Sequence, residues 1–389
     1  MIDTDIYLDH AATTPVDPAV LEAMLPFFTA RFGNPTSIYG AGRDARAGLD
    51  WARGTLAGIL HCLPREVVMT SGATESNNTA IRGVAWWNRL NGGGNHIITS
   101  AIEHHAVLHT VEGLAEHGFD ITTINPNAAG LIDPKVVEDA VRADTCLISI
   151  MYANNEIGTI QPVAEISAIA HQHDIVMHTD AVQAAGALSL DVDELGVDLL
   201  SLSAHKFYAP KGVGLLYVRR GTRIAWQQLG GGQEYARRAG TENVPGIVGM
   251  AAGLTLAQRA MPERNAHQRV LRDRIIDGIL SRVPDSQLNG SRDLRLPNNV
   301  NVSFAGVEGE SILLDLDMHG IAASSGSACA TGSTEPSHVL LALGISEDLA
   351  QGSLRLTVGK DNTVAEIDRA IDTIATSVQR LREMSALVT

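Results

Sequence analysis

The chain has 389 residues, of which 45% are hydrophobic and 19% are charged, and its formal net charge is −15. This length favours two domains over one small core, and the composition is typical of a globular protein. The negative charge argues against direct binding to nucleic acid or to an anionic membrane surface.

Neither membrane insertion, secretion nor a disulfide framework is expected. No segment reaches the length of a transmembrane helix, and the N-terminus lacks a signal-peptide pattern, so we expect a cytoplasmic protein. Cys62, Cys146 and Cys329 are far apart and odd in number, which excludes a disulfide framework and a Cys-x-x-Cys metal site. Cys62 and Cys146 lie in apolar runs and are expected in the core. The 14 histidines are not clustered with other ligands, so no intrinsic metal site is predicted.

From about residue 65 to 220, short apolar runs alternate with helix-length segments. This pattern is typical of an α/β domain with a mostly parallel sheet. The predicted strands cover residues 67–70, 96–99, 121–124, 146–150, 175–178, 197–203 and 214–218. Helical periodicity covers residues 75–88, 105–117, 134–143 and 163–173. We therefore expect a sheet flanked by helices, with functional residues at the carboxyl ends of its strands.

A second, smaller domain is predicted after the glycine run at 230–232. A long helix over about 244–283 leads into it. It would hold strands at 298–303 and 353–358, a loop rich in serine and glycine, and a terminal helix from about 364. We divide the chain into a large domain, residues 15–260, and a small α+β domain formed by residues 1–14 and 261–389.

Two predicted strands end on residues that suit pyridoxal phosphate. Lys206 follows the apolar run 197–203, and a lysine held there in a dry pocket can form a Schiff base with an aldehyde. Asp180 ends the run 175–180 and could pair with a pyridinium nitrogen. Taken singly, Lys206 could be a surface lysine and Asp180 a helix cap. Together with the motifs below, they predict a site for this cofactor.

A phosphate-binding turn is predicted at 70–78, where a strand ends and a helix begins. Gly72 permits a sharp turn, so that the amides of Ala73 and Thr74 can point at an anion, and the Thr74 hydroxyl adds a donor. The alternative is a simple helix-capping turn.

Further polar residues follow other strands. His104 could lie flat on a pyridine ring and exchange protons with the substrate. The alternatives are a surface pair with His105 or, with His109, a metal site, which lacks further ligands close in sequence. Asn155 and Gln183 could donate to the phenolic oxygen of the cofactor, although such residues are more often caps or turn formers.

The small domain contributes a thiol and a guanidinium. Cys329 lies in a run of serine, glycine and alanine, and a thiol on such a loop can enter a site, attack and withdraw. Alternatively, Cys329 is only a small loop residue. Arg355 alternates with Leu354 and Leu356 on its strand, so it faces the opposite side and could grip a substrate carboxylate. A surface arginine on an edge strand is the competing interpretation.

Together these motifs resemble the pyridoxal-phosphate cysteine desulfurases of the NifS/IscS type, in the fold-type I, class V aminotransferase group. The loop around Cys329 resembles the IscS-like branch, and His10 replaces a tyrosine common in the family. The matching stretches, in family order over nearly the whole chain, are Tyr7–Pro15, Gly33–Ser37, Thr70–Ser76, Glu103–His104, Asn154–Gly158, His178–Gln183, Ser203–Lys206, Arg238–Thr241, Ser324–Cys329 and Glu335–Ser337.

The resemblance implies a large domain with a mostly parallel seven-stranded sheet, a homodimer, and a role for each matching residue. Lys206, Cys329 and His104 would be catalytic, and Asn155 and Arg355 would bind the substrate carboxylate. The implied cofactor contacts are Ala73, Thr74, His104, Asn155, Asp180, Gln183, Ser203, His205, Lys206 and, from the other subunit, Thr241.

The implied reaction converts L-cysteine to L-alanine and leaves the sulfur as a persulfide on Cys329. The sulfur would pass to an acceptor, either an iron–sulfur scaffold protein or a tRNA-thiolation carrier, and Cys329 could transiently ligate an iron–sulfur cluster. One alternative is a selenocysteine lyase or another class V aminotransferase or lyase. Another is a non-catalytic sulfur-assembly scaffold.

Overall fold

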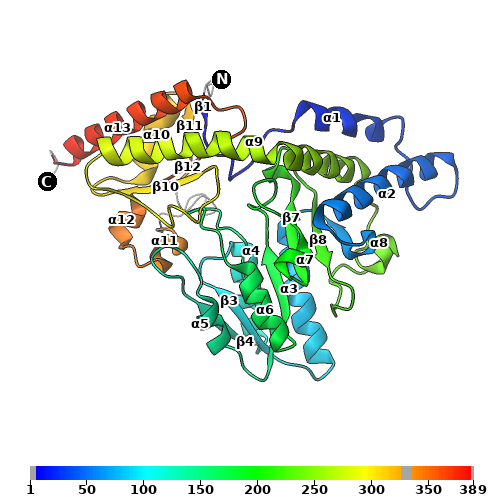
Figure 1. The fold of residues 1–389 in the computed structure, drawn as a ribbon. Coiled ribbons are helices and arrows are strands. Elements are labelled where there is room, and N and C mark those ends of the chain that lie inside the picture. The colour runs from blue at the N-terminus through cyan, green and yellow to red at the C-terminus, as the bar shows by residue number, and fades with distance from the viewer. Residues whose placement is uncertain (1–5, 326–334, 387–389) are drawn as a thin grey trace.

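The structure is a computed structural model that describes residues 6–325 and 335–386. Its largest element is a seven-stranded sheet (Figure 1). In spatial order the strands are β2 (Val67–Thr70), β8 (Gly214–Val218), β7 (Leu199–Ser203), β6 (Val176–Asp180), β5 (Thr145–Ser149), β3 (His96–Ser100) and β4 (Asp120–Ile124). Only β8 runs antiparallel to its neighbours, so the sheet is mostly parallel, as the sequence predicts.

Helices cover both faces of this sheet, and its strands are largely buried on both sides apart from the edge strand β4. Successive residues of β7 show the alternation: Leu199 packs in one core cluster and Leu200 in the other. The first cluster includes α3 (Ala73–Leu90) and α4 (His105–Glu116). The second includes α2 (Gly40–Leu60), α6 (Val163–Gln172) and the first part of α9 (Val244–Arg282).

A second core lies around a three-stranded antiparallel sheet. Strand β10 (Asn299–Phe304) lies between β12 (Ser353–Thr357) and β9 (Ser286–Leu288). Helices α10 (Gly309–Met318), α13 (Val364–Ala386) and the second part of α9 pack against it. Helix α9 thus runs along both cores (Figure 1). The exact division of the chain at 14/15 and 260/261 stays a prediction.

Shorter elements complete the described chain. Strand β1 (Ile6–Tyr7) pairs with β11 (Ile321–Ala322) in parallel. The remaining helices are α1 (Pro18–Met24), η1 (Leu25–Phe28), η2 (Pro64–Glu66), α5 (Pro134–Asp139), α7 (Val192–Leu195), η3 (Ala204–Lys206), α8 (Gln233–Ala236), α11 (His338–Ala342) and α12 (Glu347–Gln351).

The structure confirms the predicted strands and main helices. It also contains α2, which was not predicted from the sequence. Glycine lowers helix propensity, and five glycines interrupt the helical pattern of α2. Close packing explains one of them, because a Cβ added at Gly48 would lie 2.4 Å from the Phe27 ring. All six residues of β10 are buried, on its polar face as well as on its apolar face. The amides of Asn299 and Asn301 on the polar face donate to the Glu156 carbonyl.

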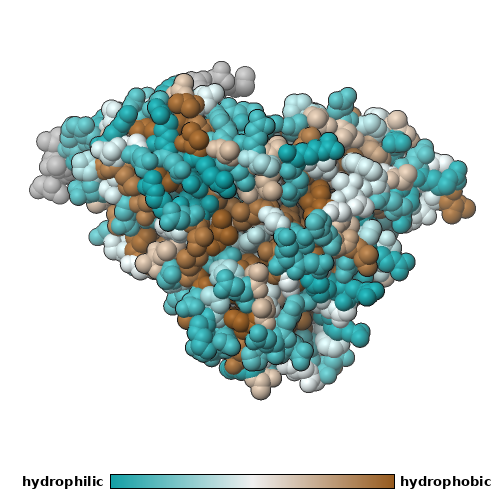
Figure 2. Space-filling model, in the orientation of Figure 1, coloured by the Kyte–Doolittle hydropathy of each residue, from teal (hydrophilic) through white to brown (hydrophobic). Residues whose placement is uncertain are grey.

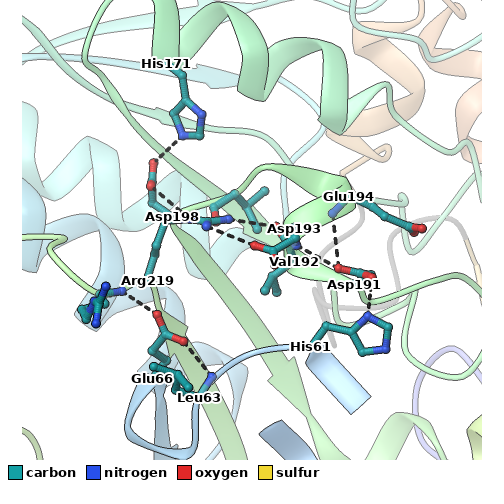
Figure 3. Close-up of polar contacts among 12 residues, drawn as sticks. His61, Leu63, Glu66, His171, Asp191, Val192, Asp193, Glu194, Asp198 and Arg219 are labelled. Carbon is teal, nitrogen blue, oxygen red and sulfur yellow. Dashed lines mark hydrogen bonds and ion pairs between the residues drawn. The ribbon is translucent and has the colours of Figure 1, made fainter. Parts of the chain in front are cut away.

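A polar network ties together loops at the edge of the large sheet (Figure 3). Asp198 accepts a 2.9 Å hydrogen bond from the Met177 amide and contacts His171. Asp191 caps α7 and pairs with His61, which follows α2. The residues labelled in this view lie outside the cavity described below, so we assign them a role in holding the loops.

Most of the surface in Figure 2 is hydrophilic. Within residues 6–325 and 335–386, no helix combines the length and hydropathy needed to cross a bilayer.

Candidate active site

A cavity of about 520 Å³ opens where β6 and β7 end and α3 begins. Its wall also includes residues from the N-terminal segment and from β12. The structure brings together nearly all the site residues predicted from the sequence: the cavity is lined by Ala73, Thr74, His104, Asn155, Asp180, Gln183, Ser203, His205, Lys206 and Arg355.

Lys206 ends the short helix η3 just beyond β7. Its Nζ atom donates hydrogen bonds of 2.6 and 2.7 Å to the carbonyls of Ala11 and Ala12. The interpretation of Lys206 as a surface lysine is therefore wrong, and the N-terminal motif at 7–15 helps to place the amine.

His205 lies beside Lys206 and remains neutral near pH 7. Burial, followed by the charges of Lys206 and Lys211, lowers the pKa of His205 to about 4. Its Nδ1 atom lies 3.1 Å from the Thr13 hydroxyl. A neutral imidazole at this end of the cavity can act as a hydrogen-bond donor without adding charge.

Asp180 is fixed by two donors at the end of β6. Asn77 Nδ2 donates to one carboxylate oxygen over 2.6 Å, and the Val182 amide donates to the other over 3.0 Å. Asn77 lies on α3, one turn beyond Thr74, and the sequence analysis assigned it no role. The position of Asn77 within the 70–78 motif was the only feature of the sequence that could have pointed to it.

The start of α3 contributes to the wall of the cavity. Gly72, Ala73 and Thr74 line the cavity, and no side chain caps this helix at Gly72. A Cβ added at Gly214 would lie 2.7 Å from the Gly72 Cα, so glycine at 214 permits the turn to lie close against β8. Helix N–H groups that are not capped by a side chain suit a phosphate, which favours the phosphate-binding interpretation.

His104 is the N-cap residue of α4, where its Nδ1 accepts a 3.0 Å hydrogen bond from the Ala106 amide. An accepting Nδ1 carries no proton, so the neutral ring bears its proton on Nε2. Burial is the main cause that lowers the pKa of His104, and Lys206 lowers it further against an opposing effect of Asp180. His104 is half-buried and lines the cavity, which disagrees with its interpretation as a surface histidine.

Arg355 is buried, with 2% of its surface exposed, so the surface-arginine interpretation is also wrong. One terminal nitrogen donates to Asp9 over 2.7 Å, and the other donates to the Asn155 carbonyl over 3.2 Å. Its Nε atom is buried and makes no hydrogen bond to the described residues. Asp9 was not singled out from the sequence, although it belongs to the 7–15 motif.

The remaining predicted residues differ in their placement. Gln183 Nε2 donates to the Ala11 carbonyl over 3.1 Å. Thr241 is exposed and does not line the main cavity of its own chain. It lines a smaller cavity of about 60 Å³ together with Ser71 and Gly212, which also line the main cavity. Cys329 lies outside the described residues.

Histidines gather beside the cavity, where the sequence raised a metal site as an alternative. The ring centroid of His105 lies 4.8 Å from that of His109 and 4.7 Å from that of His338. Across residues 6–325 and 335–386, however, no group of three or more His, Cys, Asp or Glu side chains could hold a metal ion.

Comparison with known protein families shows to which family this chain belongs. The family model for aminotransferase class V matches residues 6–370. The chain therefore belongs to the class V aminotransferase family and has the fold-type I architecture that the sequence predicts.

Within this family, the similar curated proteins are named cysteine desulfurases. A protein of Clostridium botulinum named "Cysteine desulfurase IscS" is 47% identical over 388 residues, covering 99% of this chain and 97% of the relative. A protein of the same name from Methanosarcina thermophila is 51% identical over 382 residues, covering 98% of this chain and 94% of the relative.

Solved structures agree in fold over nearly the full chain. A structure titled "NIFS-like protein" superposes with a TM-score of 0.90 at 37% identity, covering 96% of this chain and 99% of that one. A structure titled "SspA in complex with cysteine" has a TM-score of 0.81 at 40% identity, covering 92% and 100%.

Proposed function

We infer that this chain is a cysteine desulfurase that uses pyridoxal phosphate to convert L-cysteine to L-alanine. The observation that carries this inference is the convergence of Lys206, Asp180 and the start of α3 on one cavity. The relatives named cysteine desulfurase support the reaction, and the SspA complex supports cysteine as the substrate.

The residues present fit the cofactor. The uncapped start of α3, with Thr74, Ser203 and neutral His205, would hold the phosphate. Asp180 would hold the ring nitrogen in its protonated form, and the His104 ring would lie against the face of the pyridine ring. Asn155 and Gln183 would contact the ring substituents. When bound, pyridoxal phosphate supplies an aldehyde that reacts with amines and a cationic ring that withdraws electrons from the substrate.

Lys206 and Arg355 then act on the substrate. The Lys206 amine removes the proton from the substrate α-carbon, a role that its position at the end of η3 permits. Arg355, together with Asn155, binds the substrate carboxylate. The Arg355 guanidinium is already oriented by Asp9, so little side-chain freedom is lost on binding.

Sulfur transfer requires the thiolate of Cys329. The thiolate attacks the sulfur of the substrate, an S–S bond forms, and the bond between the β-carbon and sulfur breaks. The β-carbon takes up a proton and becomes the methyl group of alanine, while Cys329 is oxidised to a persulfide. Substrate and thiol together account for all atoms of alanine and persulfide, so no further oxidant is needed.

The test is to load the protein with pyridoxal phosphate and add L-cysteine and a dithiol reductant. We expect an absorption band near ~420 nm before addition, as for a protonated lysine imine, and then equal amounts of alanine and sulfide. Sulfide without dependence on Cys329, or turnover of selenocysteine alone, would favour the selenocysteine lyase alternative. A protein that binds no cofactor would favour the non-catalytic scaffold.

We propose further that the enzyme is a homodimer in which Thr241 binds the phosphate in the partner's site. The exposed position of Thr241 is compatible with this role. One dead variant would carry a bulky charged residue at 241 and a second would be Cys329→Ala. Refolding them together gives about half mixed dimers, each with one intact site, so about a quarter of the activity should return. No recovery despite proven mixed dimers would refute the shared site.

The sulfur acceptor is proposed to be an iron–sulfur scaffold protein, with a tRNA-thiolation carrier as the second candidate. The names of the relatives support a sulfur-donating enzyme of the IscS type. Incubating the persulfide form with each acceptor and measuring the sulfur transferred would separate the two.

A further inference from the structure

The residue that precedes His104 is held in place from the other end of the chain. His338 begins α11, and its Nε2 atom donates a 3.0 Å hydrogen bond to the carbonyl of Glu103. That carbonyl belongs to the peptide bond that joins Glu103 to His104. A side chain 235 positions away therefore contacts the peptide that carries His104.

The start of α11 is itself firmly placed. Ser337 caps this helix and also donates to the buried carboxyl group of Glu156. Val339 and Leu340 pack in a hydrophobic cluster with Ile102 and Met151. The backbone of His338 is therefore held in place, so its side chain can restrain the peptide between residues 103 and 104.

The side chains of the two residues that this peptide joins are also held by hydrogen bonds. The Glu103 carboxyl group is buried and accepts hydrogen bonds from the Ser100 hydroxyl, at 2.6 Å, and from the Met151 amide, at 2.9 Å. Beyond the peptide, His104 Nδ1 accepts from the Ala106 amide. The Glu103 side chain, the Glu103 carbonyl and the His104 ring are thus held by different partners. His338 is the partner of the carbonyl.

We propose that His338 is a positioning residue for the desulfurase reaction, which sets the orientation of the His104 ring through the Glu103 carbonyl. This proposal rests on the proposed function, in which the His104 ring lies against the cofactor. If the donor were lost, the peptide could rotate and the ring could tilt away from the pyridine plane. A tilt of this kind lowers the rate of the reaction with cysteine and changes the free energy of unfolding little.

Three variants of the cofactor-loaded enzyme test this. His338→Met removes the donor at similar volume, and His338→Gln keeps an N–H donor at similar reach. His109→Met is the matched control, because His109 also contacts His105 through its ring, whereas the Glu103 carbonyl bonds to His338. We expect kcat/KM for cysteine to fall about tenfold in His338→Met, as for one lost hydrogen bond, and less than about threefold in the other two.

A mutant cycle with His104→Ala separates positioning from packing. If His338 acts through His104, His338→Met should cost less than about twofold once His104 is absent. An equal loss in both backgrounds, or equal losses in His338→Gln and His338→Met, would overturn the proposal.

A measurement without cofactor separates this inference from the proposed function. In the cofactor-free protein labelled with ¹⁵N-histidine, the His104 ring resonances should shift in His338→Met and stay unchanged in His109→Met. Unchanged resonances in His338→Met would overturn the positioning role. Wild-type protein that forms no alanine would instead overturn the desulfurase assignment, whatever the resonances show.

Discussion

Asn77 donates a 2.6 Å hydrogen bond to Asp180, and both side chains are buried. Asn77 lies on α3, close after the turn that would bind the phosphate, whereas Asp180 ends β6. The contact therefore links the two ends of the proposed cofactor site, the phosphate end and the ring-nitrogen end.

Replacing Asn77 with leucine should weaken cofactor binding and folding together. The change removes a donor from a buried carboxylate, which costs about 1.5–3 kcal/mol for a hydrogen bond to a charged group. The free energy of unfolding and the affinity for pyridoxal phosphate would be measured in titrations. Asn78→Leu is the matched control, because Asn78 is the half-buried neighbour of Asn77 on α3 and its side chain donates to the Thr74 carbonyl. Equal effects of the two changes would contradict the role of Asn77.

Lys206→Ala should leave a folded protein that binds the cofactor without turnover of cysteine. The change removes the amine that, in the proposed mechanism, both attaches the cofactor and moves the substrate proton. Absorption spectra and alanine formation would be compared with those of Lys135→Ala, an exposed lysine in surface ion pairs. Alanine formation at the wild-type rate in Lys206→Ala would refute the assignment.

Arg355→Ala should mainly raise KM for cysteine, by about tenfold or more, because a carboxylate contact exists in the ground state as well as the transition state. Arg355→Lys keeps the charge but lacks the two-pronged donor, so its KM should lie between those of the alanine variant and the wild type. Arg274→Ala, which removes an exposed ion pair with Asp368, serves as the control. A fall in kcat at unchanged KM would show that Arg355 has another role.

The buried carboxyl group of Glu103 should make stability depend on pH. Burial, with a further contribution from the charge of Asp180, raises the pKa of Glu103 to about 8 from 4.5. The folded state then binds a proton that the unfolded state releases, so stability falls as pH rises from about 4.5 to about 8. The slope is at most about 1.4 kcal/mol per pH unit.

Glu103→Gln imitates the protonated carboxyl group and should lack this slope. Both proteins would be unfolded with denaturant between pH 5 and pH 9. The free energy of unfolding of the variant should increase relative to that of the wild type up to about pH 8. A difference that stays constant over this range would mean that Glu103 does not titrate there.

The site residues that lie at strand ends could be predicted from the sequence, because the carboxyl ends of parallel strands meet at the same edge of a sheet. Lys206, Asp180 and His104 follow apolar runs whose carboxyl ends meet at one edge of the sheet. Their partners were harder to foresee. Asp9 and Arg355 are 346 positions apart, and no local pattern predicts that they form an ion pair.

The same reason explains why His338 was missed. Its role depends on how α11 packs against residues near Ile102, which is a property of the tertiary structure. Helix α2 was missed for a different reason, since its five glycines lower the local helix propensity, while close packing against Phe27 accounts for the glycine at 48.

The most direct test of the central claim is mass spectrometry of the enzyme after one turnover with L-cysteine and without a reductant. We expect one added sulfur atom on the peptide that contains Cys329, in amounts equal to the alanine formed. Cys329→Ser should show neither, whereas Cys62→Ser should behave as the wild type, because burial raises the pKa of that thiol to about 12. Alanine formed by Cys329→Ser at the wild-type rate, or sulfur found on another residue, would contradict the account.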